Sequence, residues 1–299
     1  MKNGFRIFLA ALVALGFSWC AFVLAPVLQL GAEKQTTVLN SSDLYPVQRG
    51  DFAAQGLQVY RANGCAACHT AQVQQDGVGC DVVLTGMGTN QPADFKAFMK
   101  SLCELPDLQN CSDSLSKNLA AWNGALPKIL LHGAREADAG KLADKLSAAG
   151  LKSEVRIVAT GPDIARDWGL RHSVAEDFLW DDPVQLGSVR IGPDLANVGA
   201  RFPDARWQLL HLYAPQVVVK GSTMPPFRYL FKMEKTRGEP APDALKLPRE
   251  LAPPSGYEVV PTDQARELAA YLLSLRAEVP LHDAPFTPPA PAPARPNKP

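Results

Sequence analysis

The stretch NGCAACHTAQ, residues 63–72, decides what this chain folds around. It brings Cys65, Cys68 and His69 together in a Cys-x-x-Cys-His run, which is the attachment signature of c-type haem. Two thiols at this spacing can reach the vinyl groups on one porphyrin edge and form thioethers, and the histidine that follows then faces the iron. The motif therefore predicts one covalently attached haem c, with His69 as an iron ligand.

Other uses of these residues explain them less well. A zinc site needs four ligands of matching type, whereas Cys65, Cys68 and His69 could supply only part of that set, in a run too tight for tetrahedral geometry. A thiol redox pair is typical of a βαβ context. A disulfide between the two cysteines would leave His69 unexplained. Haem c is therefore the preferred interpretation, and zinc or redox chemistry is the alternative.

The second iron ligand is expected to be a histidine or methionine further along the chain. Methionine raises the potential of the iron and suits electron transfer. Met224 lies in GSTMPPF, where two prolines stiffen the loop and remove backbone donors near the sulfur. With His69 and Met224 both on the iron, no coordination position stays open, so we expect electron transfer and no catalysis by this chain alone. The other candidates are Met87, Met99, Met233, His172 and His211.

Further residues are expected to support the haem. An iron-bound imidazole is oriented by an acceptor on its far nitrogen, and the carbonyl of Pro193 in IGPDL is the candidate because proline offers only an acceptor. Haem propionates need donors, and Arg190 or Arg201 could pair with them. The predicted cofactor-binding residues are thus Cys65, Cys68, His69, Met224, Pro193 and Arg190, and the metal ligands are His69 and Met224.

An apolar stretch near the N-terminus predicts a membrane anchor over residues 1–32. No charge occurs between Ile7 and Ala32, and about 24 helical residues reach ~36 Å, enough to cross a ~30 Å hydrocarbon core. A cleaved signal peptide is the alternative, but its apolar core usually has about 7–15 residues. Lys2 and Arg6 precede the span. Because the positive side stays in the cytoplasm, we expect a single-pass protein of the inner membrane, with its bulk in the periplasm.

The rest of the chain predicts a mainly α fold with a small α/β insertion. Helices are expected in four segments that surround the Cys-His motif or follow it: residues 49–64, 192–202 with Pro193 near the start, 204–215, and 262–279 with Thr262 as the N-cap. Residues 80–159 read instead as a β-α-α-β-α-β domain inserted into a cytochrome c domain of the class I type. That domain is then discontinuous, over 33–79 and 160–280, and the Pro/Ala-rich tail 281–299 cannot form a core.

The segment RHSVAEDFLWDDPVQLGSVRIGPDLANVGARFPDARWQLLHLYAPQVVVKGSTMPPFRYL, residues 171–230, resembles the mono-haem cytochrome c subunit (subunit II) of cbb3-type haem–copper oxidases. The approach GLQVYRANGCAACH is similar as well. The resemblance implies that Cys65 and Cys68 bind the haem, that His69 and Met224 are its axial ligands, and that electrons pass to a catalytic haem–copper subunit beside other cytochrome subunits. The sequence departs from the family at residues 80–159 and at Gln74 and Gln75, where an Arg-Pro pair is expected.

The insertion has a resemblance of its own, to the C-terminal domain of the bacterial ribosomal stalk protein. A ribosomal role makes no sense outside the cytoplasm, so the resemblance implies only the fold. A docking surface for another respiratory protein and an inert embellishment are the two readings. Of Cys80, Cys103 and Cys111, the last two are expected to pair in an oxidising compartment.

Three functions remain open at this stage. The first is the electron-transfer subunit of a membrane oxidase. The second is an anchored cytochrome that shuttles electrons between complexes without belonging to either. The third is the cytochrome subunit of a nitric oxide reductase, which shares the plan of an anchor and a haem. The balanced charge, 30 Lys and Arg against 30 Asp and Glu, argues against a nucleic-acid partner.

Overall fold

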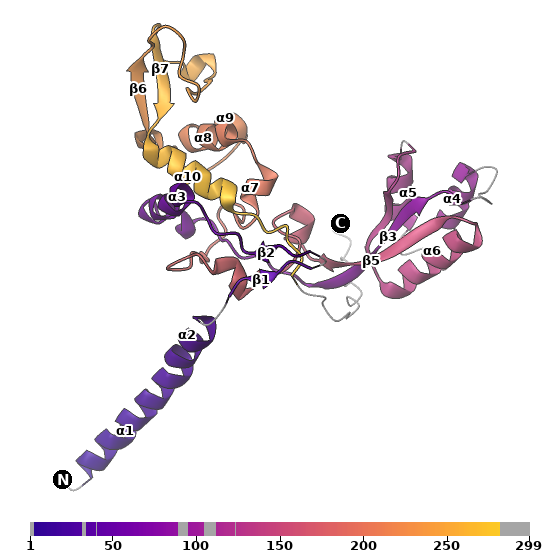
Figure 1. The fold of residues 1–299 in the computed structure, drawn as a ribbon, viewed down its shortest axis with the longest axis horizontal. Coiled ribbons are helices and arrows are strands. Elements are labelled where there is room, and N and C mark those ends of the chain that lie inside the picture. Colours follow the sequence, from indigo (N-terminus) through magenta and orange to yellow (C-terminus); the bar gives the residue numbers. More distant parts are fainter. Residues whose placement is uncertain are drawn as a thin grey trace, which may run out of the picture. The chain divides into compact units, whose positions relative to one another are not determined.

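The computed structural model describes residues 3–31, 34–39, 41–88, 95–104, 112–122 and 124–281 (Figure 1). The chain divides into two compact units. Unit 1 comprises Met1–Thr70, Ser173–Gly192 and Asp204–Ser274, and unit 2 comprises Ala71–His172, Pro193–Pro203 and Leu275–Pro299. The predicted tail beyond Leu281 and the predicted partner Cys111 lie outside the described residues.

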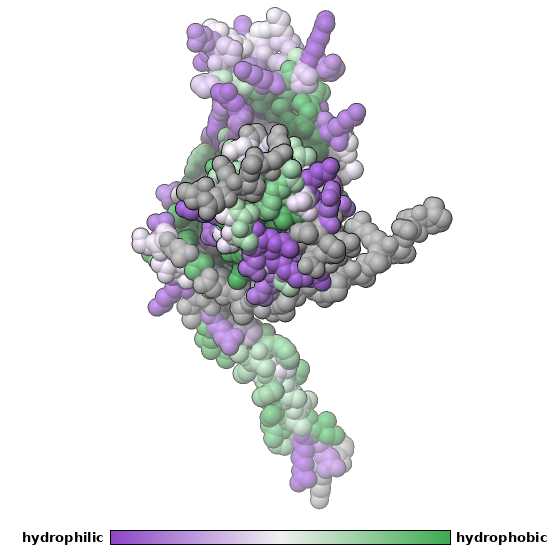
Figure 2. Space-filling view, turned by 90° about the vertical axis from the view of Figure 1, so that its right-hand side faces the viewer, coloured by the Kyte–Doolittle hydropathy of each residue, from purple (hydrophilic) through white to green (hydrophobic). Residues whose placement is uncertain are grey.

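Unit 1 begins with a long apolar helix. It runs through α1 (Gly4–Trp19), η1 (Cys20–Leu24) and α2 (Ala25–Leu30). The stretch Gly4–Gln29 is long and apolar enough to cross a membrane, and none of it is buried in the protein. Figure 2 shows this helix in the green of hydrophobic residues. The structure is therefore consistent with the predicted membrane anchor.

The π-helical turn η1 in this helix has a local cause. Pro26 is the second residue after the turn and has no N–H, and its ring would clash with the carbonyl four residues earlier in a regular α-helix. The N–H of Ala25 instead bonds the carbonyl of Cys20, five residues back. One wider turn thus keeps the helix continuous.

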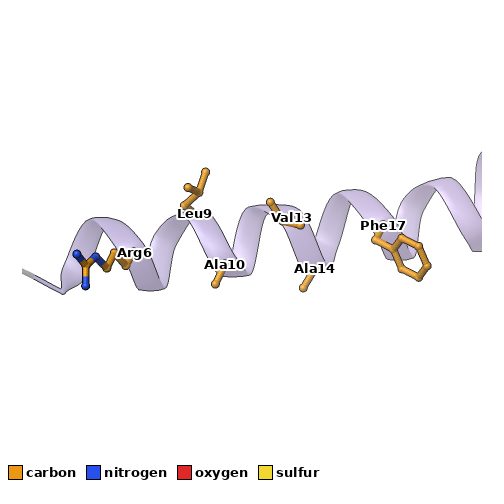
Figure 3. A pocket seen from close by; sticks show the side chains of 6 residues that line it. All are labelled: Arg6, Leu9, Ala10, Val13, Ala14 and Phe17. Carbon is orange, nitrogen blue, oxygen red and sulfur yellow. The ribbon is translucent and has the colours of Figure 1, made fainter.

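A shallow groove runs along one face of α1 (Figure 3). The small side chains of Ala10 and Ala14 leave space between the larger ones of Leu9, Val13 and Phe17. Arg6 closes the N-terminal end. Apart from that guanidinium the groove is apolar, which suits an environment of acyl chains.

The soluble core of unit 1 is built on two crossing helices, α3 (Asp51–Ala62) and α10 (Asp263–Ser274). Gly56 lets the helices touch, since a Cβ added there would lie 2.7 Å from Cβ of Tyr271 and against the Glu267 carbonyl. The rings of Tyr60 and Tyr271 then meet with centroids 5.3 Å apart. This packing fixes the end of α3, where the Cys-His motif begins.

The helix α10 has the N-cap that the sequence predicts, but it ends at Ser274 and not at Val279. The Thr262 hydroxyl accepts from the N–H of Ala265 at 3.4 Å, as an N-cap does. The buried positions recur at helical spacing: Ala265, Leu268, Ala269, Tyr271 and Leu272. The predicted N-cap is confirmed, and these positions form the face that packs into the core.

Shorter elements complete unit 1. The other helices are α8 (Ala205–Tyr213) and α9 (Pro215–Val218). Two antiparallel hairpins pair β1 (Thr36–Thr37) with β2 (Leu44–Tyr45), and β6 (Phe231–Lys235) with β7 (Tyr257–Pro261). Single 3-10 turns lie at η2 (Cys65–Ala67), η5 (Ala175–Phe178), η6 (Arg228–Leu230) and η7 (Arg249–Leu251).

Unit 2 is built around a three-stranded antiparallel sheet in the order β4-β3-β5 (Figure 1). Its elements along the chain are β3 (Gly77–Gly86), α4 (Phe95–Cys103), α5 (Ser112–Ala120), β4 (Lys128–Ala134), α6 (Glu136–Ala148) and β5 (Lys152–Thr160). A single 3-10 turn, η4 (Ile164–Arg166), follows. This is the β-α-α-β-α-β order expected from the sequence.

One apolar cluster holds this sheet and its helices together. Val82 and Leu84 of β3 meet Leu142 and Leu146 of α6, and all four side chains are fully buried. Met99 of α4 belongs to the same cluster. Because Met99 is a core residue of this domain, its presence needs no iron to explain it. Met99 is therefore no longer a candidate iron ligand.

The helix expected over residues 192–202 is much shorter in the structure. Only α7 (Val198–Arg201) is helical, so Pro193 does not start a helix. Asp194 gives the reason: its carboxylate accepts from the N–H of Ala196 at 2.8 Å and from the N–H of Gln72 at 2.9 Å. A side chain that takes up backbone donors in this way favours a turn over a helix.

Candidate haem site

The Cys-His motif sits on a tight turn at the end of α3. Gly64 ends the helix with φ +65°, a left-handed conformation that glycine adopts without strain. The 3-10 turn η2 follows, and the N–H groups of Cys68 and His69 both bond the Cys65 carbonyl, at 3.2 and 3.1 Å. Side chains three apart eclipse each other in a 3-10 turn. The turn therefore directs both thiols to one side of the chain.

Cys65 and Cys68 are free thiols, and each residue is half-buried. Burial raises the pKa of Cys65 to about 11, so this thiol is neutral at pH 7. Within the described residues, no three His, Cys, Asp or Glu side chains are grouped to hold a metal ion. The disulfide and zinc interpretations of the motif therefore gain no support.

Two glycines of a distant segment hold His69 in place. The N–H of Gly192 donates to the Cys68 carbonyl at 2.9 Å. A Cβ on Gly192 would lie 2.6 Å from Nδ1 of His69 and 2.9 Å from its Nε2, so only glycine fits beside this imidazole. Gly187 has φ +73°, and a Cβ there would lie 2.9 Å from Cα of Thr70. Sequence reasoning missed both residues, although the glycine pair in LGSVRIGP was a visible signal.

Arg190 lies in the same segment, between the two glycines. Its Nε donates to the hydroxyl of Thr70 at 2.8 Å, next to His69 in the chain. The structure thus brings Arg190 to the Cys-His motif, as a haem-binding role requires. Its pairing with a propionate stays a prediction.

His211 on α8 also comes close to the motif. Burial, together with the nearby His69, lowers the pKa of His211 to about 4. Its ring stacks on Trp207 with centroids 4.9 Å apart. The Nδ1 atom of His211 is buried and has no hydrogen-bond partner among the residues that the structure describes. A buried polar atom of this kind points to a group that is bound there.

The remaining candidate ligands differ in their surroundings. Met224 is half-buried in a loop. In the same loop, the N–H of Phe227 donates to the Leu212 carbonyl at 2.8 Å. These contacts fix the loop but do not by themselves assign the sulfur to the iron, so the role of Met224 stays a prediction. His172 in unit 2 is exposed, with Nδ1 3.1 Å from Oε1 of Gln75. This surface contact disfavours His172 as a ligand.

Pro193 and Arg201 belong to unit 2. Pro193 is exposed, and the structure leaves its predicted role as the acceptor for His69 a prediction. Arg201 donates from Nη2 to the Asp194 carbonyl at 2.5 Å. Its Nε is buried without a partner in the described part of the chain, and burial lowers its pKa. Its predicted pairing with a haem propionate stays a prediction.

The residues of unit 1 fit a covalently attached haem. Both thiols lie on one side of the turn, His69 has a glycine cradle, and His211 carries a buried polar atom to satisfy. The segment that contains Gly187 and Gly192 also exposes apolar side chains that a porphyrin could cover: Val184, Leu186, Val189 and Ile191. When bound, a haem supplies a one-electron couple at its iron.

A comparison with protein families matches this reading. Residues 159–270 match the family of the cytochrome c oxidase mono-heme subunit, FixO. The resemblance to the mono-haem subunit of cbb3-type oxidases is thereby confirmed, and with it the association with haem, electron transfer and an oxidase. The FixO match excludes residues 65–69, so the Cys-His motif is independent evidence for haem. A comparison with curated proteins gives no match.

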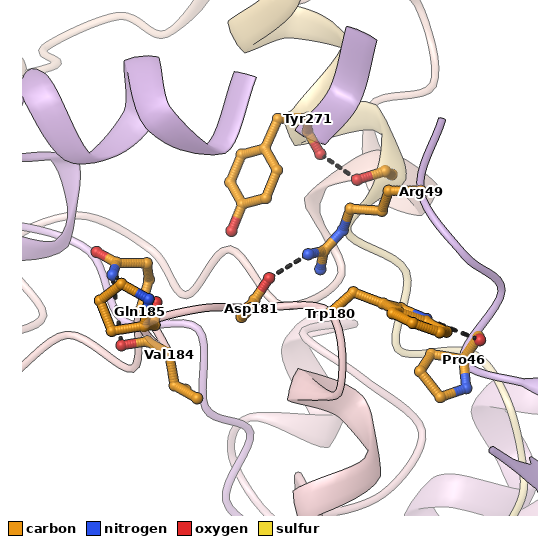
Figure 4. Close-up of polar contacts among 9 residues, drawn as sticks. Pro46, Arg49, Trp180, Asp181, Val184, Gln185 and Tyr271 are labelled. Atoms are coloured by element: carbon orange, nitrogen blue, oxygen red, sulfur yellow. Dashed lines mark hydrogen bonds and ion pairs between the residues drawn. The ribbon is translucent and has the colours of Figure 1, made fainter. Parts of the chain in front are cut away.

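A buried ion pair joins two of the segments of unit 1 (Figure 4). The guanidinium of Arg49, just before α3, bonds the carboxylate of Asp181 and lies 5.1 Å from the centroid of the Tyr271 ring. Their side chains are only 12% and 5% exposed. The indole of Trp180 donates to the Pro46 carbonyl at 3.1 Å beside them. Residues 46–49 are thus tied to the segment that also carries Gly187 and Gly192.

Substituting Arg49 tests this pair through the pH dependence of stability. Burial raises the pKa of Asp181 although Arg49 opposes the shift. Arg49→Met removes that opposition, so we expect a loss of ~3–5 kcal/mol in unfolding free energy near pH 7. Because the folded state then holds a proton more tightly than the unfolded state, stability falls as pH rises and recovers as pH is lowered.

Urea denaturation of the full chain in detergent at several pH values measures this effect. Arg49→Met with Asp181→Asn removes the unpaired charge and is expected to regain most of the loss. Arg276→Met is the matched control. The Arg276 side chain is 53% exposed, and its Nη1 lies 3.7 Å from Oε2 of Glu278. Because exposed ion pairs contribute little, this substitution should change the free energy of unfolding by less than ~0.5 kcal/mol. A pH-independent loss in Arg49→Met contradicts the role given to the pair.

Proposed function

We propose that this chain is the membrane-anchored electron-transfer subunit of a cbb3-type haem–copper oxidase. It carries one haem c on Cys65 and Cys68, with His69 and Met224 on the iron, and passes electrons toward the catalytic subunit that reduces oxygen. The observation that carries the proposal is the cradle of Gly192 around His69, within a segment that matches the FixO family. The discontinuous cytochrome c domain, the Pro193 acceptor and the Arg190 propionate contact are parts of this proposal.

In this function the residues of the chain bind the haem and orient its histidine ligand. The two cysteines attach the haem, Gly192 packs against the imidazole of His69, and Gly187 packs against the backbone of His69 and Thr70. His211 lies near that imidazole. The exposed apolar side chains of Val184, Leu186, Val189 and Ile191 offer a surface that the porphyrin would cover. The protein therefore sets the surroundings of the haem, and the reduction of oxygen belongs to a partner subunit.

The apolar helix and the insertion extend the proposal. With Lys2 before the helix and Arg6 in its first turn, the positive side lies in the cytoplasm, and the chain that follows the helix lies in the periplasm. Haem attachment through thioethers occurs outside the cytoplasm, which supports this orientation. The inserted domain, residues 80–159, offers a surface for another respiratory protein. Cys103 is a free thiol in the structure, so the pairing expected between Cys103 and Cys111 is not part of this proposal.

Purification from the native membrane in mild detergent tests the assignment. We expect the chain to retain its haem in acid acetone and to co-purify with a large multi-spanning haem–copper subunit that consumes oxygen. Nitric oxide turnover by that partner would favour the reductase alternative, and isolation of the chain alone would favour a free shuttle. Cys65→Ser with Cys68→Ser should release the haem, whereas Cys20→Ser, in the apolar helix, is the control that keeps it.

A further inference from the structure

The last strand of the sheet in unit 2 has one edge that pairs with nothing in the described chain. β5 pairs with β3 from Thr160, opposite Gly77, to Lys152, opposite Gly86, and with no other described strand. Alternate residues of such a strand direct their N–H and C=O groups away from the sheet. Nine residues of β5 thus form a long edge that could accept another strand.

The side chains along this edge are exposed on both faces. Val155 lies opposite Val82, and Ile157 opposite Cys80, so both belong to the core face of the sheet. Yet Val155 is 42% exposed and Ile157 is 57% exposed. Neither α6 nor any other described element covers them fully. An added strand would remove these apolar side chains from water.

The charges beside Val155 are arranged to favour a copy of the same strand. Glu154 and Arg156 flank Val155 and share the opposite face, where Glu154 Oε2 lies 2.7 Å from Arg156 Nη2. In an antiparallel pair of β5 strands centred on Val155, Glu154 of each copy lies opposite Arg156 of the other. Directly opposed charges of unlike sign stabilise such a pair, and like charges destabilise it.

Neighbouring registers lack this complementarity. A pair centred on Glu154 sets two glutamates against each other and Arg156 against Lys152. A pair centred on Arg156 sets two arginines against each other. A pair centred on Ser153 sets Glu154 against Lys152 but leaves Arg156 opposite Gly150, outside the strand. Edge charges usually prevent association of sheets, but here a second copy centred on Val155 gives both Glu154 and Arg156 a partner of unlike charge. We propose that β5 is a self-pairing interface, in which two copies of this chain join their sheets antiparallel about Val155.

Cysteine cross-linking tests the register. Val155 lies on the two-fold axis and faces its own counterpart, where opposed Cβ atoms are ~4.5–5.5 Å apart, close to disulfide reach. We expect Val155→Cys in the full haem-loaded chain, in mild detergent, to form at least ~5-fold more disulfide-linked dimer on mild oxidation than the parent chain does. Ile129→Cys is the matched control, because it is 44% exposed on the other edge strand and has no predicted counterpart.

Charge reversal provides the second arm. Glu154→Arg opposes arginines twice in the dimer and is expected to weaken dimerisation about tenfold or more in light-scattering titrations. Glu154→Arg with Arg156→Glu restores the complementarity, and dimerisation should return to about the parent level. Unchanged haem absorption in each variant shows that the chain still folds. Equal dimerisation by single and double variants, cross-linking no better than Ile129→Cys, or cross-linking to a different protein would overturn the proposal.

Discussion

Gly56→Ala is expected to separate α3 from α10 and to cost about 3 kcal/mol of unfolding free energy. The added methyl group would meet the Glu267 carbonyl and lie 2.7 Å from Cβ of Tyr271. Both neighbours belong to the body of a helix, so neither can give way without moving α10. Since α3 ends at the Cys-His motif, the haem environment should loosen as well. Urea denaturation and the haem absorption spectrum measure the two effects.

Gly140→Ala is the matched control for this substitution. Gly140 also lies inside a helix, α6, but a Cβ there meets nothing within 4 Å. Alanine should therefore stabilise α6 by ~0.5–1 kcal/mol through its higher helix propensity. If the two substitutions change the free energy of unfolding in opposite directions, the effect of the interhelical contact is separated from that of helix propensity. Equal effects at both positions would show that the close approach at Gly56 contributes nothing.

Gly192→Ala is expected to displace the His69 imidazole and so alter the axial ligation of the haem. The new Cβ would lie 2.6 Å from Nδ1, well inside contact distance. Because the proposed thioethers do not involve Gly192, the haem should stay attached while its absorption spectrum and reduction potential change. Absorption spectroscopy and a redox titration of the purified chain measure these properties. An absorption spectrum and a reduction potential identical to those of the parent chain would contradict the role of Gly192 in positioning the His69 imidazole.

Gly50→Ala serves as the control for Gly192→Ala. Gly50 precedes α3 with φ −64°, and an added Cβ there meets nothing within 4 Å. At such an N-cap position the change should cost only a few tenths to about 1 kcal/mol. It should leave the spectrum and the potential unchanged. The pair therefore separates displacement of the imidazole from a general loss of stability.

Local signals predicted much of this fold. The apolar run of the N-terminal helix, the Thr262 cap and the buried stripe of α10 each depend on residues within one element. Such elements can be read from periodicity because neighbouring residues set the backbone conformation. The element order of the sheet in unit 2 followed in the same way. The helix expected at residues 192–202 failed because Asp194 binds the N–H of Gln72, 122 residues away.

The residues of the candidate site also fall into those that local sequence predicted and those that it did not. Cys65, Cys68 and His69 were predicted because their chemistry depends on spacing within one turn. The glycine cradle and the buried Arg49–Asp181 pair were not, because each joins segments more than 100 residues apart. A glycine beside an imidazole or an arginine beside a carboxylate leaves no periodic trace in the chain.

By itself, the sequence determined that this protein has an apolar helix long enough for a membrane and a motif that can bind a porphyrin through two thiols. Length and residue spacing suffice for both, since each is a property of one continuous segment. Only the tertiary structure decided which residues surround His69, which charges are buried together and which strand edge stays open. Those properties arise from contacts between distant segments, where the shape and burial of the partner determine the energy.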